Sequence, residues 1–234
     1  MEITGIKTSL FKVGENLEQF ILAHVPDIKE GDILVITSKI VALSQNRIGN
    51  LEDKVKLIHK ESKQVIKTPW ALLTLTDDGW GINAGVDESN ANNHLILLPK
   101  APFSVASTLQ KKIKKRFSLK KCGILITDTR SAPLRIGTTG RAIGFAGFRP
   151  IRSYISKKDL FGRKSRFTKS NLVDALAGSA VLLMGEGDEQ VPLVVIRNAP
   201  VNFLSRNPDA KEKILHMNPQ VDIFKSVFNK KRQK

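Results

Sequence analysis

The chain has 234 residues, of which 41% are hydrophobic and 26% charged, as in a folded globular protein. These values exclude a disordered or collagen-like chain, and no apolar run is long enough for a membrane helix. The net charge of +16, from 38 Lys and Arg against 22 Asp and Glu, favours an anionic partner. A single cysteine, Cys122, and an N-terminus without a secretory pattern lead us to expect a cytoplasmic protein.

Hydrophobic periodicity predicts the elements of the first half of the chain. Residues 15–25 carry apolar side chains at helical spacing, and residues 32–37 form an apolar run typical of a buried strand. Residues 51–65 again show helical spacing, with lysines on the outer side. Two shorter apolar runs, 70–76 and 95–98, predict strands.

The second half gives stronger patterns. Residues 104–117 predict a helix capped by Ser104, and residues 123–127 predict a buried strand. A helix is expected over 171–184, stopped by Gly185, and a strand over 191–197. Together these elements predict an α+β (mixed α/β) fold with mixed sheets and flanking helices.

No linker or internal repeat divides the chain. We therefore expect a single domain over residues 1–224, with two intertwined subdomains as an alternative, followed by a basic flexible tail over 225–234. Two further segments are basic: residues 104–121 have seven bases and no acid, and residues 149–169 have eight bases and one acid. A solvated surface is favoured over a nucleic-acid surface, because aromatic residues are only 6% of the chain and no nucleic-acid-binding motif occurs.

Acidic and glycine-rich turns are the candidate chemical sites. Gly85 permits a tight turn that could aim Asp87 and Asn90 at one point. Asp128 and Thr129 directly follow a predicted buried strand, where open sheets place metal and phosphate ligands. Residues 185–189 put two glycines and three acids between a helix and a strand. The alternative for each is an ordinary surface turn.

Oxygen ligands of these types suit Mg²⁺ or Mn²⁺. We therefore expect a metal site from Asp87, Asp128, Thr129 and Glu186, if the fold brings them together. A glycine-rich stretch, residues 136–147, is expected to be a loop whose backbone N–H groups cradle an anion. The chain has no Walker-type loop and no nucleophile elbow, and its four histidines are scattered.

Several stretches, taken in order, resemble the coenzyme F-420:L-glutamate ligase family, over roughly residues 3 to 200. They are residues 31–41 (GDILVITSKIV), 83–90 (NAGVDESN), 127–129 (TDT), 142–147 (AIGFAG), 159–163 (DLFGR) and 184–185 (MG), with 188–189 (DE) before Pro192.

The resemblance implies a GTP-dependent amide ligase that activates an acceptor carboxylate as an acyl phosphate, which the amine of L-glutamate then attacks. Asp87 and Asp128 match the family's metal-binding aspartates, and Thr129 and Glu186 fall at its other metal-ligand positions. Two Mg²⁺ or Mn²⁺ ions are implied, with K⁺ as a further candidate. Asp87, Asp128 and Lys39 are the expected catalytic residues.

The resemblance also implies the nucleotide contacts and the assembly. Ser38, Lys39 and Asn90 match nucleotide-binding positions. The nucleotide-binding loop is matched by Met184, Gly185, Glu186, Gly187, Asp188 and Glu189. A cytoplasmic homodimer that binds an anionic small-molecule acceptor is expected, without nucleic-acid or membrane partners.

The chain departs from the family pattern in several places. Leu43 stands where a lysine is usual, Glu186 replaces a glutamine, residues 130–135 and 8–11 differ, and the segment between Ser44 and Trp70 is short. Coenzyme F-420-0 is the default acceptor, and a folate-like pterin or another phosphorylated acid is the alternative. A non-catalytic nucleotide- or nucleic-acid-binding protein and a nucleotide hydrolase are the competing functions.

Overall fold

The computed structural model describes residues 1–205, 215, 217, 221–223 and 225. Its centre is a five-stranded sheet in the order β1 (Glu2–Ile6), β12 (Leu193–Arg197), β2 (Ile33–Thr37), β8 (Gly123–Ser131) and β9 (Thr138–Ala146). Strands β2 and β8 run parallel, and the other neighbours pair antiparallel. The mixed sheet and its helices confirm the predicted α+β class.

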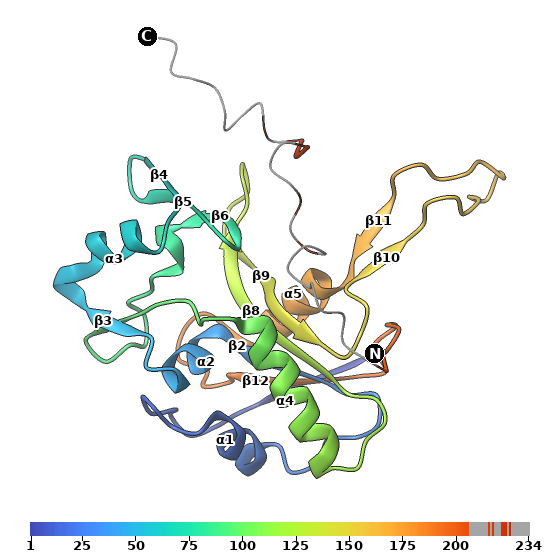
Figure 1. Ribbon diagram of the computed structural model, residues 1–234, viewed down its shortest axis with the longest axis horizontal. Coiled ribbons are helices and arrows are strands. Elements are labelled where there is room, and N and C mark those ends of the chain that lie inside the picture. Colours follow the sequence, from blue (N-terminus) through green and yellow to red (C-terminus); the bar gives the residue numbers. More distant parts are fainter. Residues whose placement is uncertain (206–214, 216, 218–220, 224, 226–234) are drawn as a thin grey trace, which may run out of the picture.

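Helices cover both faces of this sheet (Figure 1). Helices α1 (Leu17–His24) and α4 (Pro102–Arg116) pack on the face that receives Leu34 and Ile36. Helix α5 (Leu172–Met184) packs on the opposite face, against Ile33 and Val35. Because successive strand residues point to opposite faces, the uninterrupted apolar run of β2 serves both cores.

Smaller elements surround the central sheet. Helix α2 (Ser38–Ser44) follows β2 directly. The chain between α2 and α4 forms a second layer. Its elements are β3 (Ile48–Asn50), η1 (Leu51–Asp53), α3 (Lys54–Lys60), β4 (Gln64–Lys67), β5 (Leu72–Thr76), β6 (Gly79–Ile82), η2 (Asn83–Gly85) and β7 (His94–Ile96). Strands β4–β5–β6 form an antiparallel three-stranded sheet, and β3 pairs with β7.

Two predicted helices have different bounds. The helix expected over 51–65 ends at Lys60, because Val65 and Ile66 pair with strand β5 instead. The helix expected to start at Ser104 begins at Pro102, after Ala101 in a left-handed conformation. Proline suits the first turn of a helix because its missing N–H has no intrahelical acceptor there, so Ser104 is not the cap.

The glycine-rich stretch 136–147 was wrongly predicted as an anion-binding loop. Residues 138–146 form strand β9, which pairs with β8 from Ile124 to Ser131 with a bulge between Ile126 and Thr127. Asp128 and Thr129 therefore lie within β8. A Cβ on Gly140 would collide with the carbonyl of Ala177 in α5, and one on Gly144 would lie 2.7 Å from the Pro102 backbone of α4. These glycines let both helices approach the sheet.

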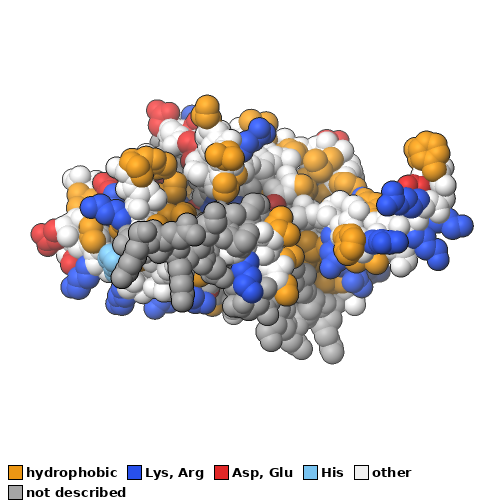
Figure 2. Space-filling model, turned by 90° about the horizontal axis from the view of Figure 1, so that it is seen from above, with side chains coloured by type: hydrophobic (Ala, Val, Ile, Leu, Met, Phe, Trp, Pro, Cys, Tyr) orange, Lys and Arg blue, Asp and Glu red, His pale blue; other side chains and the backbone are white. Residues whose placement is uncertain are grey.

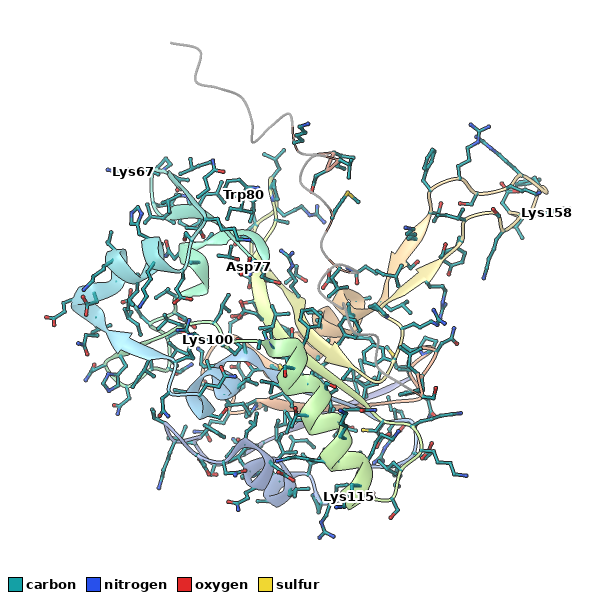
Figure 3. All side chains as sticks on the ribbon, viewed as in Figure 1. Lys67, Asp77, Trp80, Lys100, Lys115 and Lys158 are labelled. Atoms are coloured by element: carbon teal, nitrogen blue, oxygen red, sulfur yellow. The ribbon has the colours of Figure 1, made fainter. Side chains whose placement is uncertain are left out.

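The basic segment 149–169, expected to be a solvated surface, contains most of a hairpin arm. Strands β10 (Ile151–Ser153) and β11 (Lys169–Asn171) pair at its base, and the arm projects from the body (Figures 1 and 3). The predicted tail, 225–234, lies outside the described residues apart from Lys225, and the expected division at residue 224 stays a prediction.

Cys122 is fully buried, and desolvation raises the pKa of its thiol to about 12, so the thiol stays protonated. Within the described part of the chain, no helix is both long and apolar enough to cross a membrane.

Candidate active site

A cavity of about 270 Å³ opens where the carboxyl end of β2, the middle of β8, the segment after η2 and the loop after α5 meet. Every predicted site residue except Glu189 lines it. Its lining comprises Thr8, Ser9, Leu10, Phe11, Thr37, Ser38, Lys39, Ile40, Leu43, Asp87, Ser89, Asn90, Thr127, Asp128, Thr129, Val181, Met184, Gly185, Glu186, Gly187, Asp188, Gln190, Val191 and Pro192. The lining mixes an apolar wall with four carboxylates and one lysine.

Ser38 and Asp128 meet because their strands are parallel neighbours. Thr37 of β2 pairs with Thr127 of β8, which brings Ser38, the first residue of α2, close to Asp128 of β8. The Ser38 hydroxyl donates to Asp128 Oδ1 at 2.9 Å. Burial raises the pKa of the Asp128 carboxyl above its ordinary value, although Arg130 and the Ser38 hydrogen bond act in the opposite direction. Asp128 is thus a desolvated, oriented carboxyl.

Lys39 and Asp87 form the second polar group of the cavity. Lys39 Nζ lies 2.8 Å from Asp87 Oδ2 and donates to Ser89 O and Ser89 Oγ at 2.9 and 3.0 Å. Ser89 in turn donates to Asp87 from its backbone N–H (2.8 Å) and from its hydroxyl (2.9 Å). Burial acts to raise the pKa of Asp87, but the bonds from Lys39 and Ser89 outweigh it, so that pKa lies below its ordinary value.

The loop after α5 forms the opposite rim. Gly185 ends the helix with a φ of 71°, a conformation that favours glycine. Asn90 Nδ2 donates to Gly187 O at 2.7 Å, which ties this rim to the Asp87 segment. Glu186 accepts a hydrogen bond from the Thr138 hydroxyl at 3.1 Å. Glu189, predicted to bind nucleotide, accepts instead from Gly187 N at 2.9 Å and supports the loop from outside the cavity.

Comparison with known proteins gives this cavity a family context. The family model described as F420-0:Gamma-glutamyl ligase matches residues 5–56 and 48–198. A relative from Methanosarcina mazei, named Coenzyme F420:L-glutamate ligase, is 35% identical over 212 residues, which cover 82% of this chain and 83% of the relative. Relatives of the same name from Methanococcus maripaludis and Methanocaldococcus jannaschii are 32% and 31% identical, and each covers at least 96% of both chains.

The chain belongs to the F420-0:gamma-glutamyl ligase family. It is therefore an enzyme of the amide-forming ligase class, as predicted, and the cavity is its candidate active site.

The ligase cavity has a donor set that fits divalent cations. Asp87, Asp128 and Glu186 offer carboxylate oxygens and Thr129 offers a hydroxyl, which are the ligands that Mg²⁺ and Mn²⁺ prefer. Among the described residues, however, no three Asp, Glu, His or Cys side chains gather into a ready-made metal cage. This arrangement fits Mg²⁺, which usually takes one or two carboxylates and completes its shell with water and substrate phosphates.

Sequence reasoning missed two features of this ligase site. Ser89 was only part of a matched stretch, yet it bonds to both Asp87 and Lys39. An Asp-x-Ser turn pattern was the available signal, because such side chains cap their own backbone. The apolar wall, which includes Phe11, Leu43 and Val181, came from three distant segments and had no local signature.

Proposed function

We propose that this ligase adds L-glutamate to a carboxylate acceptor, with GTP as the phosphoryl donor. The acceptor is coenzyme F420-0 or a related phosphorylated or pterin-like acid. The observation that carries the proposal is the convergence of Ser38, Lys39, Asp87, Asp128 and the 184–188 loop on one cavity in a chain of this family. Relatives named Coenzyme F420:L-glutamate ligase support the choice of amine and acceptor.

The proposed reaction has two displacements. An acceptor carboxylate oxygen attacks the γ-phosphorus of GTP, the bond to the β–γ bridging oxygen breaks, and GDP leaves. The neutral amine of glutamate then attacks the acyl carbon of the acyl phosphate. Phosphate departs with the bonding electron pair, the nitrogen loses a proton to solvent, and an amide remains.

The residues of the cavity suit this chemistry by position and charge. Lys39 is the second residue of α2, directly after β2, and it lines the cavity, where its ammonium can neutralise a transferring phosphoryl group. Ser38 keeps the Asp128 carboxylate pointed into the cavity. Asp87, Asp128, Thr129 and Glu186 would hold Mg²⁺ or Mn²⁺, which would supply further neutralisation of phosphate charge. The apolar wall would receive the planar part of the nucleotide or acceptor and exclude water.

The proposal is tested with the purified protein, Mn²⁺, and GTP or ATP. We expect GTP with Mn²⁺ to raise the thermal midpoint, because a ligand that binds only the native state at about 100 times its Kd adds roughly 2.7 kcal/mol of stability. We also expect phosphate release that requires both acceptor and glutamate. Release without glutamate would indicate a hydrolase, and binding without release would indicate a non-catalytic nucleotide-binding protein.

We also propose that the ligase works as a homodimer, with the hairpin arm contacting a second copy. Leu160 and Phe161 at the arm's tip and Phe167 nearer its base are almost fully exposed. Figure 2 shows Lys and Arg side chains beside apolar ones on the projecting arm. The rim loop 186–189 carries three acids and offers a surface of opposite charge. Such contiguous exposed apolar side chains are typical of an interface.

Sedimentation velocity tests this assembly. We expect a dimer for the wild type and a folded monomer for Leu160→Ser/Phe161→Ser, because both side chains are exposed and their replacement opens no cavity within the fold. Val13→Ser, an exposed apolar residue outside the arm, is the matched control. A wild-type monomer at tens of micromolar would contradict the proposal.

A further inference from the structure

Asp87 and Asp128, which both line the cavity, come from different layers. Asp128 lies in β8 of the central sheet. Asp87 lies after β6 and η2, in the chain that continues from the three-stranded β4–β5–β6 sheet. The separation of these carboxylates therefore depends on how the small sheet is attached to the large one.

The Asp87 segment is fastened to the small sheet. The backbone N–H of Ala84 donates to the buried hydroxyl of Thr74 at 2.8 Å, and Leu72 N donates to Asn83 Oδ1 at 3.1 Å. Asp87 then forms a β-bridge with Ile96. Because β5 holds the turn at both Asn83 and Ala84, a movement of the small sheet carries Asp87 with it.

Arg130 joins the small sheet to β8, two residues from Asp128. Its Nη1 donates to Trp80 O at 3.0 Å and its Nη2 pairs with Asp78. The Arg130 side chain is buried and that of Asp78 is mostly buried, with exposed fractions of 8% and 16%. Gly81 leaves the space that the guanidinium needs, because a Cβ there would lie 2.5 Å from Arg130 Nη1. Figure 3 shows Trp80 on this small sheet, beside the outer end of the β8–β9 hairpin.

Further polar links between the two layers use groups that line the cavity. Lys39 bonds to Asp87 and Ser89, and Asn90 bonds to Gly187, and all of these residues line the cavity. A nucleotide that engaged Lys39 and Asn90, as the proposed function requires, would compete with those links. Arg130 does not line the cavity, so its contacts with Asp78 and Trp80 persist with a ligand in place.

We infer that Arg130 is a positioning residue for catalysis: through Asp78 and Trp80 it fixes the β4–β5–β6 sheet, and with it Asp87, at a working distance from Asp128. The expected effect of Arg130 on kcat rests on the proposed function. Its expected effect on the position of the Asp87 segment rests on the hydrogen-bond geometry alone.

The test compares two charge pairs on the same small sheet. Arg130→Gln/Asp78→Asn removes the buried pair without leaving one charge unpaired, which keeps the fold intact since buried pairs contribute little net stability. Lys63→Gln/Asp77→Asn removes the adjacent exposed pair and is the matched control. Gly81→Ala keeps every charge but places a methyl group in the guanidinium's space.

Two readouts are needed. Hydrogen exchange of the backbone amides of residues 83–90 in the ligand-free protein should be faster in Arg130→Gln/Asp78→Asn and in Gly81→Ala than in the wild type and the control. In both variants kcat should fall roughly tenfold to a hundredfold, as for a misplacement of about 1 Å, while the KM for glutamate changes little.

Wild-type exchange over 83–90 in the double variant, or a fall in kcat without faster exchange, would overturn the inference. If the wild type formed no amide, the proposed function would fail, and the exchange comparison would still decide whether Arg130 fixes the segment. If the double variant did not fold, Gly81→Ala would decide by the same two readouts.

Discussion

Replacing Asp128 by asparagine should lower kcat/KM by roughly 10³-fold and, at neutral pH, make the ligand-free protein more stable. Asparagine keeps the acceptor for the Ser38 hydroxyl but removes the charge that would neutralise a divalent ion beside the phosphates. Stability should rise because burial raises the pKa of this carboxyl, so the folded state holds the ionised form at a cost.

The pH dependence gives the sign of this effect. A carboxyl whose folded-state pKa is raised destabilises the fold above its unfolded pKa, and the penalty disappears as the pH falls below it. Urea midpoints of the wild type and Asp128→Asn should therefore differ most near pH 7 and converge in acid. Glu52→Gln, at an exposed position outside the cavity, should shift neither kinetics nor midpoint. An Asp128→Asn variant that is active, or less stable at pH 7, would contradict this account.

Lys39→Met should change metal and nucleotide affinity in opposite directions. The Lys39 ammonium pairs with Asp87 Oδ2, so it competes with any cation for that carboxylate. Removing a partly exposed ion pair of about 0.5–1 kcal/mol should tighten Mn²⁺ binding without nucleotide by about two- to fivefold. The same change removes the proposed phosphate contact, and kcat/KM for GTP should fall roughly a hundredfold.

Isothermal titration with Mn²⁺ alone, and then with GTP, separates the two effects. Lys39→Arg retains the charge and is the control, since it should keep the competition for Asp87. Acid stability is a second check: Lys39 helps to keep the pKa of Asp87 low, so the wild type gains stability above the unfolded pKa that Lys39→Met lacks. Weaker Mn²⁺ binding in Lys39→Met would show that Lys39 does not compete for the cation.

Local patterns predicted the buried strands and the long helices well. β2 and β12 are apolar runs with few alternatives, and α4 has apolar residues at a helical period. β9 was missed because Gly140 and Gly144, which read as loop signals, are required by the close approach of α5 and α4. Strand β4 was missed because pairing with β5 overrode the local helical spacing.

The site was predictable as chemistry and much less so as geometry. The matched stretches named Asp87, Asp128 and Lys39, and all three line the same cavity. The sequence did not predict which side chains are in contact. Lys39 contacts Asp87, 48 positions away, and Arg130 contacts Asp78, 52 positions away. Such contacts depend on how separate layers pack, and no local spacing encodes that packing.

The parallel pairing of β2 with β8 has a consequence for how this fold can diverge. Thr37 and Thr127 are neighbours across the sheet. The chain between them leaves the sheet after β2 and returns to it at β8, and the pairing of the two strands holds both ends of this segment in place. Doubling the length of such a loop costs only about 0.6 kcal/mol of closure entropy. Insertions and deletions at the surface turns of this segment can therefore accumulate between homologues while the Ser38–Asp128 bond is preserved.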